Sequence, residues 1–118
     1  MNIKAFSTLV DLSPHTLRYY EKIGLLKNIH RTSSGNRTYT SKDLKWITFV
    51  KRLKETAMPL EDILKYARLR EIGTNTVLQR QKLLEQHQEN LKIHIAQQQA
   101  HLTALEDKIN LYKNGNIN

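Results

Sequence analysis

Residues 77–112 constrain the fold most, because this segment contains no glycine and no proline and is rich in glutamine. Apolar side chains recur there at the heptad spacing that is typical of coiled-coil helices. One heptad position holds Val77, Leu84, Leu91, Gln98, Leu105 and Tyr112, and the other holds Gln81, Gln88, Ile95, Leu102 and Ile109. The segment therefore predicts one long helix with an apolar stripe along one side, which we call the seam.

A helix over these residues would be roughly 54 Å long and would reach well past a small domain of the same chain. Its seam therefore needs a partner, and a second copy of the chain related by two-fold symmetry is the common solution. We expect a homodimer. The residues expected in its interface are Val77, Leu84, Leu91, Ile95, Leu102, Leu105 and Ile109.

Positive charge is confined to the other part of the chain. Residues 1–70 hold 14 Lys and Arg against 6 Asp and Glu, a net charge of +8, whereas residues 71–118 hold 5 of each kind. A positive surface on one module is expected of a protein that binds a polyanion such as nucleic acid. Charge alone leaves open a basic domain without such a partner.

The composition also excludes several classes of function. The chain has no cysteine, which excludes disulfides, thiolate metal sites and cysteine nucleophiles. It shows no Gly-rich phosphate loop and no catalytic dyad, so we expect neither an enzyme nor a bound cofactor. The first residues lack the apolar stretch of a signal peptide and no run reaches membrane-spanning length, so we expect a cytoplasmic protein that does not enter a membrane.

A change in composition near residues 70–76 predicts a boundary between two regions. Gly73 is a helix-stop residue, and the polar residues 74–76 can cap a new helix. We therefore expect a domain over residues 1–72, followed by a linker and the long helix over residues 73–118.

The first region begins with two short helices joined by a tight turn, which is the arrangement of a helix-turn-helix. Residues 3–9 predict the first helix. Ser13 is a good N-cap for the second helix, Pro14 fits its first position, and Gly24 ends it.

The second of these helices has two different faces. Leu17 and Tyr20 share one face, which we expect to point to the core. The residues that share the opposite face are His15, Arg18, Tyr19 and Lys22. Such a face offers hydrogen-bond donors to phosphates and base edges, so we expect it to contact DNA. An ordinary solvated helix face is the alternative.

Residues 30–40 predict a two-stranded hairpin, with a turn over residues 33–36 in which Gly35 is available for positive φ. Arg37 and Tyr39 are two residues apart and so lie on the same side of their strand. A basic hairpin that follows a helix-turn-helix is typical of a wing that grips the DNA backbone. A surface loop that merely connects helices is the alternative.

Two further helices complete the region. Ser41 is expected to cap a helix that runs to about Glu55, and the next helix begins at Pro59. The residues expected in the core are Trp46, Phe49, Val50, Leu53, Leu60, Ile63, Leu64 and Ala67. Three basic residues are weaker candidates for contact with the DNA backbone, namely Lys51, Arg52 and Lys54.

Three motifs together resemble the MerR family of bacterial transcription regulators. The chain reads Thr16-Leu17-Arg18-Tyr19-Tyr20-Glu21 with Gly24-Leu25-Leu26, then Arg31, Gly35-Asn36-Arg37 and Tyr39, then Ala57-Met58-Pro59-Leu60-Glu61-Asp62-Ile63. The match spans residues 3–70. Asp11 and Ala57 stand where the family usually has glycine, and aspartate tolerates a left-handed conformation at some cost.

The resemblance implies a mainly α fold, in which a winged helix-turn-helix DNA-binding domain precedes a long helix that forms an antiparallel coiled coil. It implies a homodimer that binds a two-fold operator in double-stranded DNA and distorts the promoter so that RNA polymerase can use it. The DNA-binding residues expected are His15, Thr16, Arg18, Tyr19, Tyr20, Lys22, Arg37 and Tyr39. The alternative is a coiled-coil protein-interaction adaptor with a basic module.

The short segment after Tyr112 is most like the subgroup of the family that is associated with aldehyde and electrophile stress. Sensors in that subgroup can use a cysteine, which is absent here, so the effector stays unknown. In an antiparallel pair, His87, His94 and His101 would lie near their mates across the seam. We favour a solvated flank and no metal site, and a proton-sensitive or zinc-binding site is the alternative.

Overall fold

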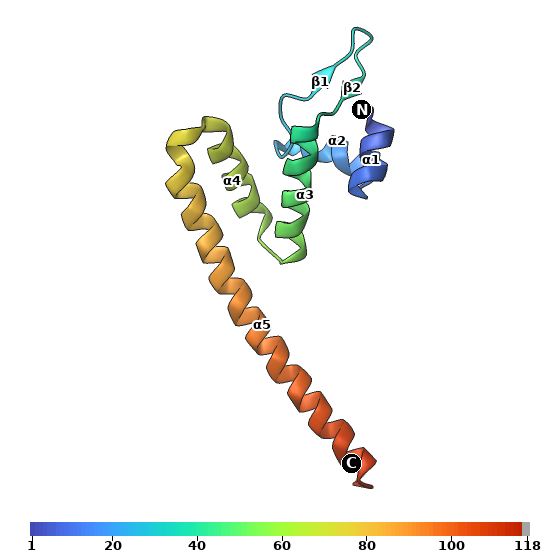
Figure 1. Ribbon diagram of the computed structural model, residues 1–118, viewed down its shortest axis with the longest axis vertical. Helices are drawn as coiled ribbons and strands as arrows, with labels where there is room; N and C mark the ends of the chain where they lie inside the picture. Colours follow the sequence, from blue (N-terminus) through green and yellow to red (C-terminus); the bar gives the residue numbers. More distant parts are fainter. Residues whose placement is uncertain (117–118) are drawn as a thin grey trace. The chain divides into compact units, whose positions relative to one another are not determined.

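The computed structural model describes residues 1–116, which form two compact units, Met1–Arg80 and a second unit that begins at Gln81 (Figure 1). Within the described residues, a two-stranded hairpin is the only sheet. The elements in chain order are α1 (Ile3–Val10), α2 (Pro14–Ile23), β1 (His30–Arg31), β2 (Arg37–Thr38), α3 (Ser41–Glu55), α4 (Leu60–Ile72), the 3-10 turn η1 (Thr74–Thr76) and α5 (Val77–Lys113). The mainly helical fold, with a winged helix-turn-helix and a long final helix, is confirmed.

Apolar side chains from the four helices α1–α4 form the core of the first unit. The indole N–H of Trp46 donates a hydrogen bond to the carbonyl of Leu25 at 2.6 Å, which ties α3 to the segment after α2. The buried residues are Phe6, Val10, Leu17, Tyr20, Leu25, Leu26, Tyr39, Trp46, Ile47, Val50, Leu53, Met58, Ile63 and Ala67. Packing around the helix-turn-helix therefore extends into the second helical pair.

The core differs from the sequence prediction at a few positions. Ile47 is fully buried although it was not predicted to be, while Phe49 and Leu64 are only half-buried and Leu60 is 40% exposed. Phe49 lies at the edge of the core, where its ring packs against Tyr66 with the centroids 5.6 Å apart. The apolar spacing in the sequence identified the correct helices. In α3, however, it included Phe49, which lies at the edge of the core, and missed Ile47, which lies inside it.

The caps of the first helices follow from the sequence. The Ser13 side chain accepts a hydrogen bond from the Thr16 amide at 3.0 Å, and Gly24 ends α2 in a left-handed conformation at φ 90°. Asp11 closes α1 at φ 54°, as expected for the turn of the helix-turn-helix. The predicted cap of α3 was wrong by one residue. Thr40, not Ser41, is the N-cap, because its hydroxyl and the carboxylate of Asp43 form a reciprocal capping box.

The turn between α3 and α4 carries backbone strain. Ala57 has φ 65°, a left-handed conformation that costs an L-residue with a Cβ about 1–2 kcal/mol. Hydrogen bonds from the Ala57 amide to the Lys54 carbonyl and from the Met58 amide to the Leu53 carbonyl, both 3.0 Å, hold this turn. Burial of Met58 beside them explains why the strained residue is retained.

Tyr39 joins the hairpin to α1. Its ring stacks on Phe6 with the centroids 4.3 Å apart and the planes within 4°. The Tyr39 side chain is 2% exposed, and its hydroxyl has no hydrogen-bond partner among the described residues. Burial raises the pKa of this hydroxyl above its ordinary value. The tyrosine therefore behaves as a core residue in the neutral form.

The second unit contains α5 from Gln81 onward, and the helix continues through Lys113. None of the described side chains of this helix is buried within the single chain. Five residues of the predicted seam are large, apolar and more than two-fifths exposed, namely Val77, Ile95, Leu102, Leu105 and Ile109. No helix among the described residues combines the length and apolar character needed to span a membrane.

We predict that Ala57→Gly raises the free energy of unfolding by up to about 1 kcal/mol. Glycine adopts positive φ without the steric cost, and its greater loss of entropy on folding, about 0.5–1 kcal/mol, offsets part of the gain. Denaturant unfolding checks the change. The matched control is Ala5→Gly in the first turn of α1, where the backbone is helical and the same chemical change should destabilise the protein. Equal destabilisation by both variants would contradict the role assigned to Ala57.

We predict that Tyr39→Phe is neutral or stabilising by up to about 1 kcal/mol at pH 7, because it removes a buried hydroxyl without a partner. At high pH the two proteins should diverge. The unfolded tyrosine loses its proton near pH 10, before the folded one does, so the wild type loses stability above about pH 10 in a way that the variant does not. Urea unfolding at about pH 7 and pH 10.5 measures both effects. A larger pH dependence in the variant would refute the assignment.

Candidate DNA-binding surface

Helix α2 presents the predicted two faces. Leu17 and Tyr20 are buried at 0% and 3% exposure, and they fix the rotation of the helix against the core. The exposed residues of the opposite side are His15, Arg18, Tyr19 and Lys22. Thr16 is half-buried in the first turn, where its hydroxyl accepts a hydrogen bond from that of Ser13 at 2.9 Å. The structure therefore brings four predicted DNA-binding side chains to one solvent-facing surface.

Tyr20 differs from its prediction as a DNA-binding residue. Its ring lies in the core, and the ammonium of Lys54 contacts it at 3.0 Å from the hydroxyl oxygen and 5.0 Å from the ring centroid. The Tyr20 side chain therefore packs on the core side of α2 and is not available to contact DNA. Tyr39 is also buried, so it shapes the base of the hairpin and offers no accessible side chain.

The hairpin over residues 30–38, which we call the wing, has the predicted turn. Gly35 has φ 86°, and its amide donates to the Thr32 carbonyl at 2.9 Å. The strands pair antiparallel, with His30 opposite Thr38 and Arg31 opposite Arg37. A wing with only two paired residues in each strand needs other contacts to fix its position.

Glu21 supplies those contacts. One carboxylate oxygen accepts a hydrogen bond from Nη2 of Arg31 at 3.0 Å, and the other accepts one from Nε of Arg37 at 2.6 Å. Nη1 of Arg31 also donates to the Gly35 carbonyl at 3.2 Å. The hydrogen bond to Glu21 raises the pKa of the Arg37 guanidinium above its ordinary value. One side chain of α2 therefore holds both strands of the wing.

No role was predicted for Glu21 from the sequence. The available signal was that it is one of only two acidic residues among residues 1–40, in a region with many cations. Arg37, predicted to contact DNA, is half-buried and bound to this carboxylate. The ion pair with Glu21 holds the Arg37 side chain beside the exposed face of α2.

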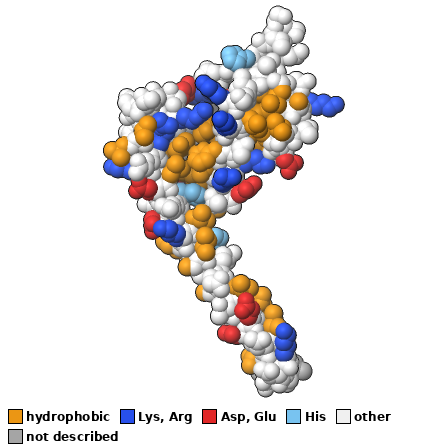
Figure 2. Space-filling view, in the orientation of Figure 1, with side chains coloured by type: hydrophobic (Ala, Val, Ile, Leu, Met, Phe, Trp, Pro, Cys, Tyr) orange, Lys and Arg blue, Asp and Glu red, His pale blue; other side chains and the backbone are white. Residues whose placement is uncertain are grey.

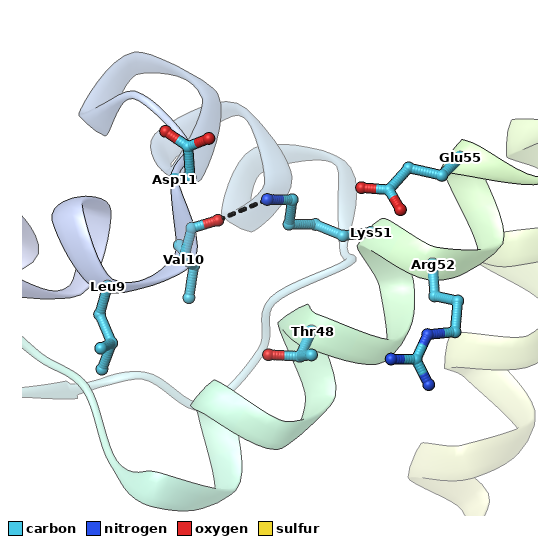
Figure 3. Close-up of a pocket in the computed structure, with 7 residues that line it drawn as sticks. All are labelled: Leu9, Val10, Asp11, Thr48, Lys51, Arg52 and Glu55. Atoms are coloured by element: carbon cyan, nitrogen blue, oxygen red, sulfur yellow. Dashed lines mark hydrogen bonds between the residues drawn. The ribbon is translucent and has the colours of Figure 1, made fainter.

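Lys51, a weaker candidate for DNA contact, has an internal partner. Its ammonium donates to the Val10 carbonyl at 2.7 Å, and Figure 3 shows this side chain reaching from α3 to the end of α1. A cation near the C-terminus of a helix is favourable because carbonyl groups there lack helical partners. The surrounding hollow of about 240 Å³ is also lined by Leu9, Asp11 and Arg52.

Basic side chains are concentrated on the first unit. Figure 2 shows clusters of Lys and Arg over this unit and a sparser mixture of both signs along α5. On α4, the guanidinium of Arg70 lies 4.3 Å from the centre of the Trp46 ring, and Glu71 pairs with Lys27 at 2.6 Å. Several cations thus have internal partners, whereas Arg18 and Lys22 lie exposed on α2.

The histidines of α5 form no metal cluster within the described part of one chain, where no group of three or more His, Asp or Glu residues is close enough to hold an ion. His94 and His101 are exposed, and His87 is half-buried.

Comparison with known proteins agrees with this geometry. Residues 1–69 match the model of the MerR HTH family regulatory proteins. An uncharacterized HTH-type transcriptional regulator of Haemophilus influenzae is 40% identical over 104 residues, which cover 88% of this chain and 77% of the relative.

Two solved structures are similar over nearly the whole chain. A MerR family transcriptional regulator from Listeria monocytogenes has a TM-score of 0.91 and 36% identity, with 96% of this chain and 86% of that chain covered. HiNmlR, a MerR family regulator lacking the sensor domain and solved bound to promoter DNA, has a TM-score of 0.87 and 37% identity, with 96% and 90% covered. The chain therefore belongs to the MerR family of helix-turn-helix transcriptional regulators.

Proposed function

We propose that this regulator binds a two-fold operator in promoter DNA as a homodimer, with one α2 in the major groove of each half-site. The observation that carries the proposal is the division of α2 into a buried face and an exposed face. Leu17 and Tyr20 hold the helix in the core, so Arg18, Tyr19 and Lys22 face solvent together. A helix presented in this way can read base edges and bind phosphates.

The exposed residues have distinct chemical capacities. Arg18 can donate two hydrogen bonds to a guanine edge or bind a phosphate, and Lys22 can act as a point charge on a phosphate. His15 and Thr16 lie in the first turn of α2, where the positive end of the helix dipole favours a phosphate. Tyr19, 47% exposed, can contact the sugar-phosphate backbone or a thymine methyl group.

Dimerisation through the seam supplies the two-fold symmetry. Most of its apolar residues are exposed in one chain, Leu84 and Leu91 are half-buried, and their heptad spacing matches a coiled coil with a second copy. We assign DNA binding to residues 1–72 and assign dimerisation to residues 73–118, with the two helices antiparallel as the family resemblance implies. An antiparallel pair would separate two DNA-binding domains so that they can occupy two half-sites.

Promoter distortion follows as the regulatory step. The dimer would bend and untwist its operator so that RNA polymerase can use both promoter elements, and contacts from both subunits would offset the cost of deforming the DNA. HiNmlR is solved bound to promoter DNA, which supports the part of this proposal that places the binding site in a promoter. We place the protein in the cytoplasm, where it acts on DNA without catalysing a reaction.

Selection from a pool of random duplexes tests the proposal. The full chain should enrich a two-fold sequence and should bind it with an affinity that falls steeply as salt increases. Enrichment of no sequence, with capture of an acidic protein instead, would favour the protein-interaction adaptor. Footprinting on the enriched duplex should show distortion at its centre.

The faces of α2 give a matched pair of variants. We predict that Arg18→Ala weakens binding to the selected duplex by about 1–3 kcal/mol and leaves folding intact. Leu17→Ala should lower the free energy of unfolding by about 2–5 kcal/mol because it leaves a cavity in the core. Gel shifts and thermal melts separate the two effects. Unfolding caused by Arg18→Ala, with only a binding defect in Leu17→Ala, would show that the faces are reversed.

The seam gives a second pair. We predict that Leu91→Lys yields monomers with much weaker operator binding, because a charge in an apolar interface is unpaired and the second half-site is lost. Ile93→Lys introduces the same residue at an exposed position outside the seam and should leave the dimer intact. Sedimentation equilibrium measures both. A dimeric Leu91→Lys protein would mean that another surface joins the subunits.

A further inference from the structure

We propose that Glu21 is a positioning residue for DNA selectivity: it fixes the wing beside α2 and keeps two wing arginines from binding phosphates indiscriminately. The inference rests on the proposed function. It assigns a role in DNA selectivity to an acidic residue that is not among the proposed DNA contacts. Its chemistry is unusual for the site, since a carboxylate next to DNA phosphates is repelled unless cations neutralise it.

The geometry of Glu21 is that of a two-armed clamp. Each carboxylate oxygen is bound to a different arginine, Arg31 on β1 at 3.0 Å and Arg37 on β2 at 2.6 Å. These two arginines are themselves opposite each other in the two-residue ladder. Both strands of the wing are therefore fixed to one point on α2, and no other ion pair among the described residues joins the wing to α2.

The partial exposure of these three side chains indicates that their ion pairs position the wing more than they stabilise the fold. The side chains of Glu21 and Arg37 are 25% exposed and that of Arg31 is 43% exposed. Isolated ion pairs at such exposures contribute little to the free energy of unfolding, but a shared carboxylate with two partners restricts where those partners can go. Loss of Glu21 should therefore change the position of the wing far more than it changes global stability.

The position of Glu21 on α2 links this restriction to DNA reading. Glu21 follows Arg18 by three residues and precedes Lys22, so it lies at the border between the exposed face and the buried face. A fixed wing can meet the backbone only when α2 sits at one depth and register in the groove. A loose wing, with two unneutralised arginines, would bind phosphates in any register and would raise non-specific affinity.

Glu21→Gln tests this, because it keeps the shape of the side chain and removes its charge. The variant should bind random duplex several-fold more tightly and show a steeper salt dependence, while its ratio of selected-duplex to random-duplex affinity falls by roughly tenfold, the size of one lost base contact. Glu21→Asp keeps the charge but shortens the reach. It should lower the ratio without raising affinity for random duplex.

The charge control is Glu55→Gln. Glu55 is exposed in the last turn of α3 and forms no ion pair with any described residue. Glu55→Gln changes the net charge by the same amount as Glu21→Gln. It should therefore raise the affinities for the selected and the random duplex slightly and leave their ratio unchanged. If Glu21→Gln alters the ratio no more than Glu55→Gln does, the inference is wrong.

Amide hydrogen exchange without DNA provides an independent readout. In Glu21→Gln the amides of Thr32 and Gly35, which donate to the carbonyls of Asn36 and Thr32 within the wing, should exchange faster, while those of the core helices keep their protection. Unchanged wing amides would refute the clamp. If the wild type itself selects no sequence, the proposed function fails and the role in selectivity falls with it, but the exchange result still decides whether Glu21 holds the wing.

Discussion

The burial of Leu17 and Tyr20 fixes the rotation of α2, and the candidate surface depends on that rotation. Three consecutive residues of a helix cannot share a face, so the run Arg18-Tyr19-Tyr20 is divided by the core. Tyr20 turns inward, where Lys54 contacts its ring and hydroxyl, and the preceding pair turns outward. A rotation of one residue would bury the arginine and expose the tyrosine. Core packing and DNA recognition are thus two consequences of one constraint.

The turns around α2 show how strongly the core determines the backbone. Asp11, Asn28 and Ala57 all have positive φ, at 54°, 57° and 65°. Each such residue adds strain that packing must offset. Asp11 and Asn28 are of the types that tolerate this conformation best, whereas alanine is not. The strain at Ala57 therefore depends most on its neighbours, including the buried Met58.

Local signals in the sequence predicted most of the fold. Ser13, Pro14 and Gly24 mark the ends of α2 through side-chain and backbone preferences that act over one turn, and these signals needed no tertiary information. The same local reasoning chose Ser41 over Thr40 as the cap of α3, because both hydroxyls are suitable and only the reciprocal bond with Asp43 distinguishes them.

Contacts between residues that are far apart in the sequence could not be predicted from these local signals. The alternation of a strand put Arg37 and Tyr39 on one side, but it could not show that Tyr39 stacks on Phe6 from the first helix. Lys51 was likewise predicted as a candidate for DNA contact, but its ammonium donates a hydrogen bond to the carbonyl of Val10. In a basic domain, cations are numerous and their partners lie far away in sequence. Which of them remain available for DNA depends on the few acceptors of the fold, and among the described carboxylates Glu21 is the one that pairs with two cations.

The distribution of charge gives this dependence its functional meaning. Residues 1–70 carry all of the net charge and residues 71–118 carry equal numbers of both signs, so electrostatic attraction to DNA and apolar association are located on different segments. Attraction by charge is indifferent to sequence, so a domain with a large excess of cations binds any duplex unless some cations are restrained. Lys51, Arg31 and Arg37 have internal partners, so fewer cations are free to bind DNA of any sequence. The net positive charge that attracts the protein to DNA stays the same. Selectivity then depends on the exposed residues of α2, whose positions are fixed by the core.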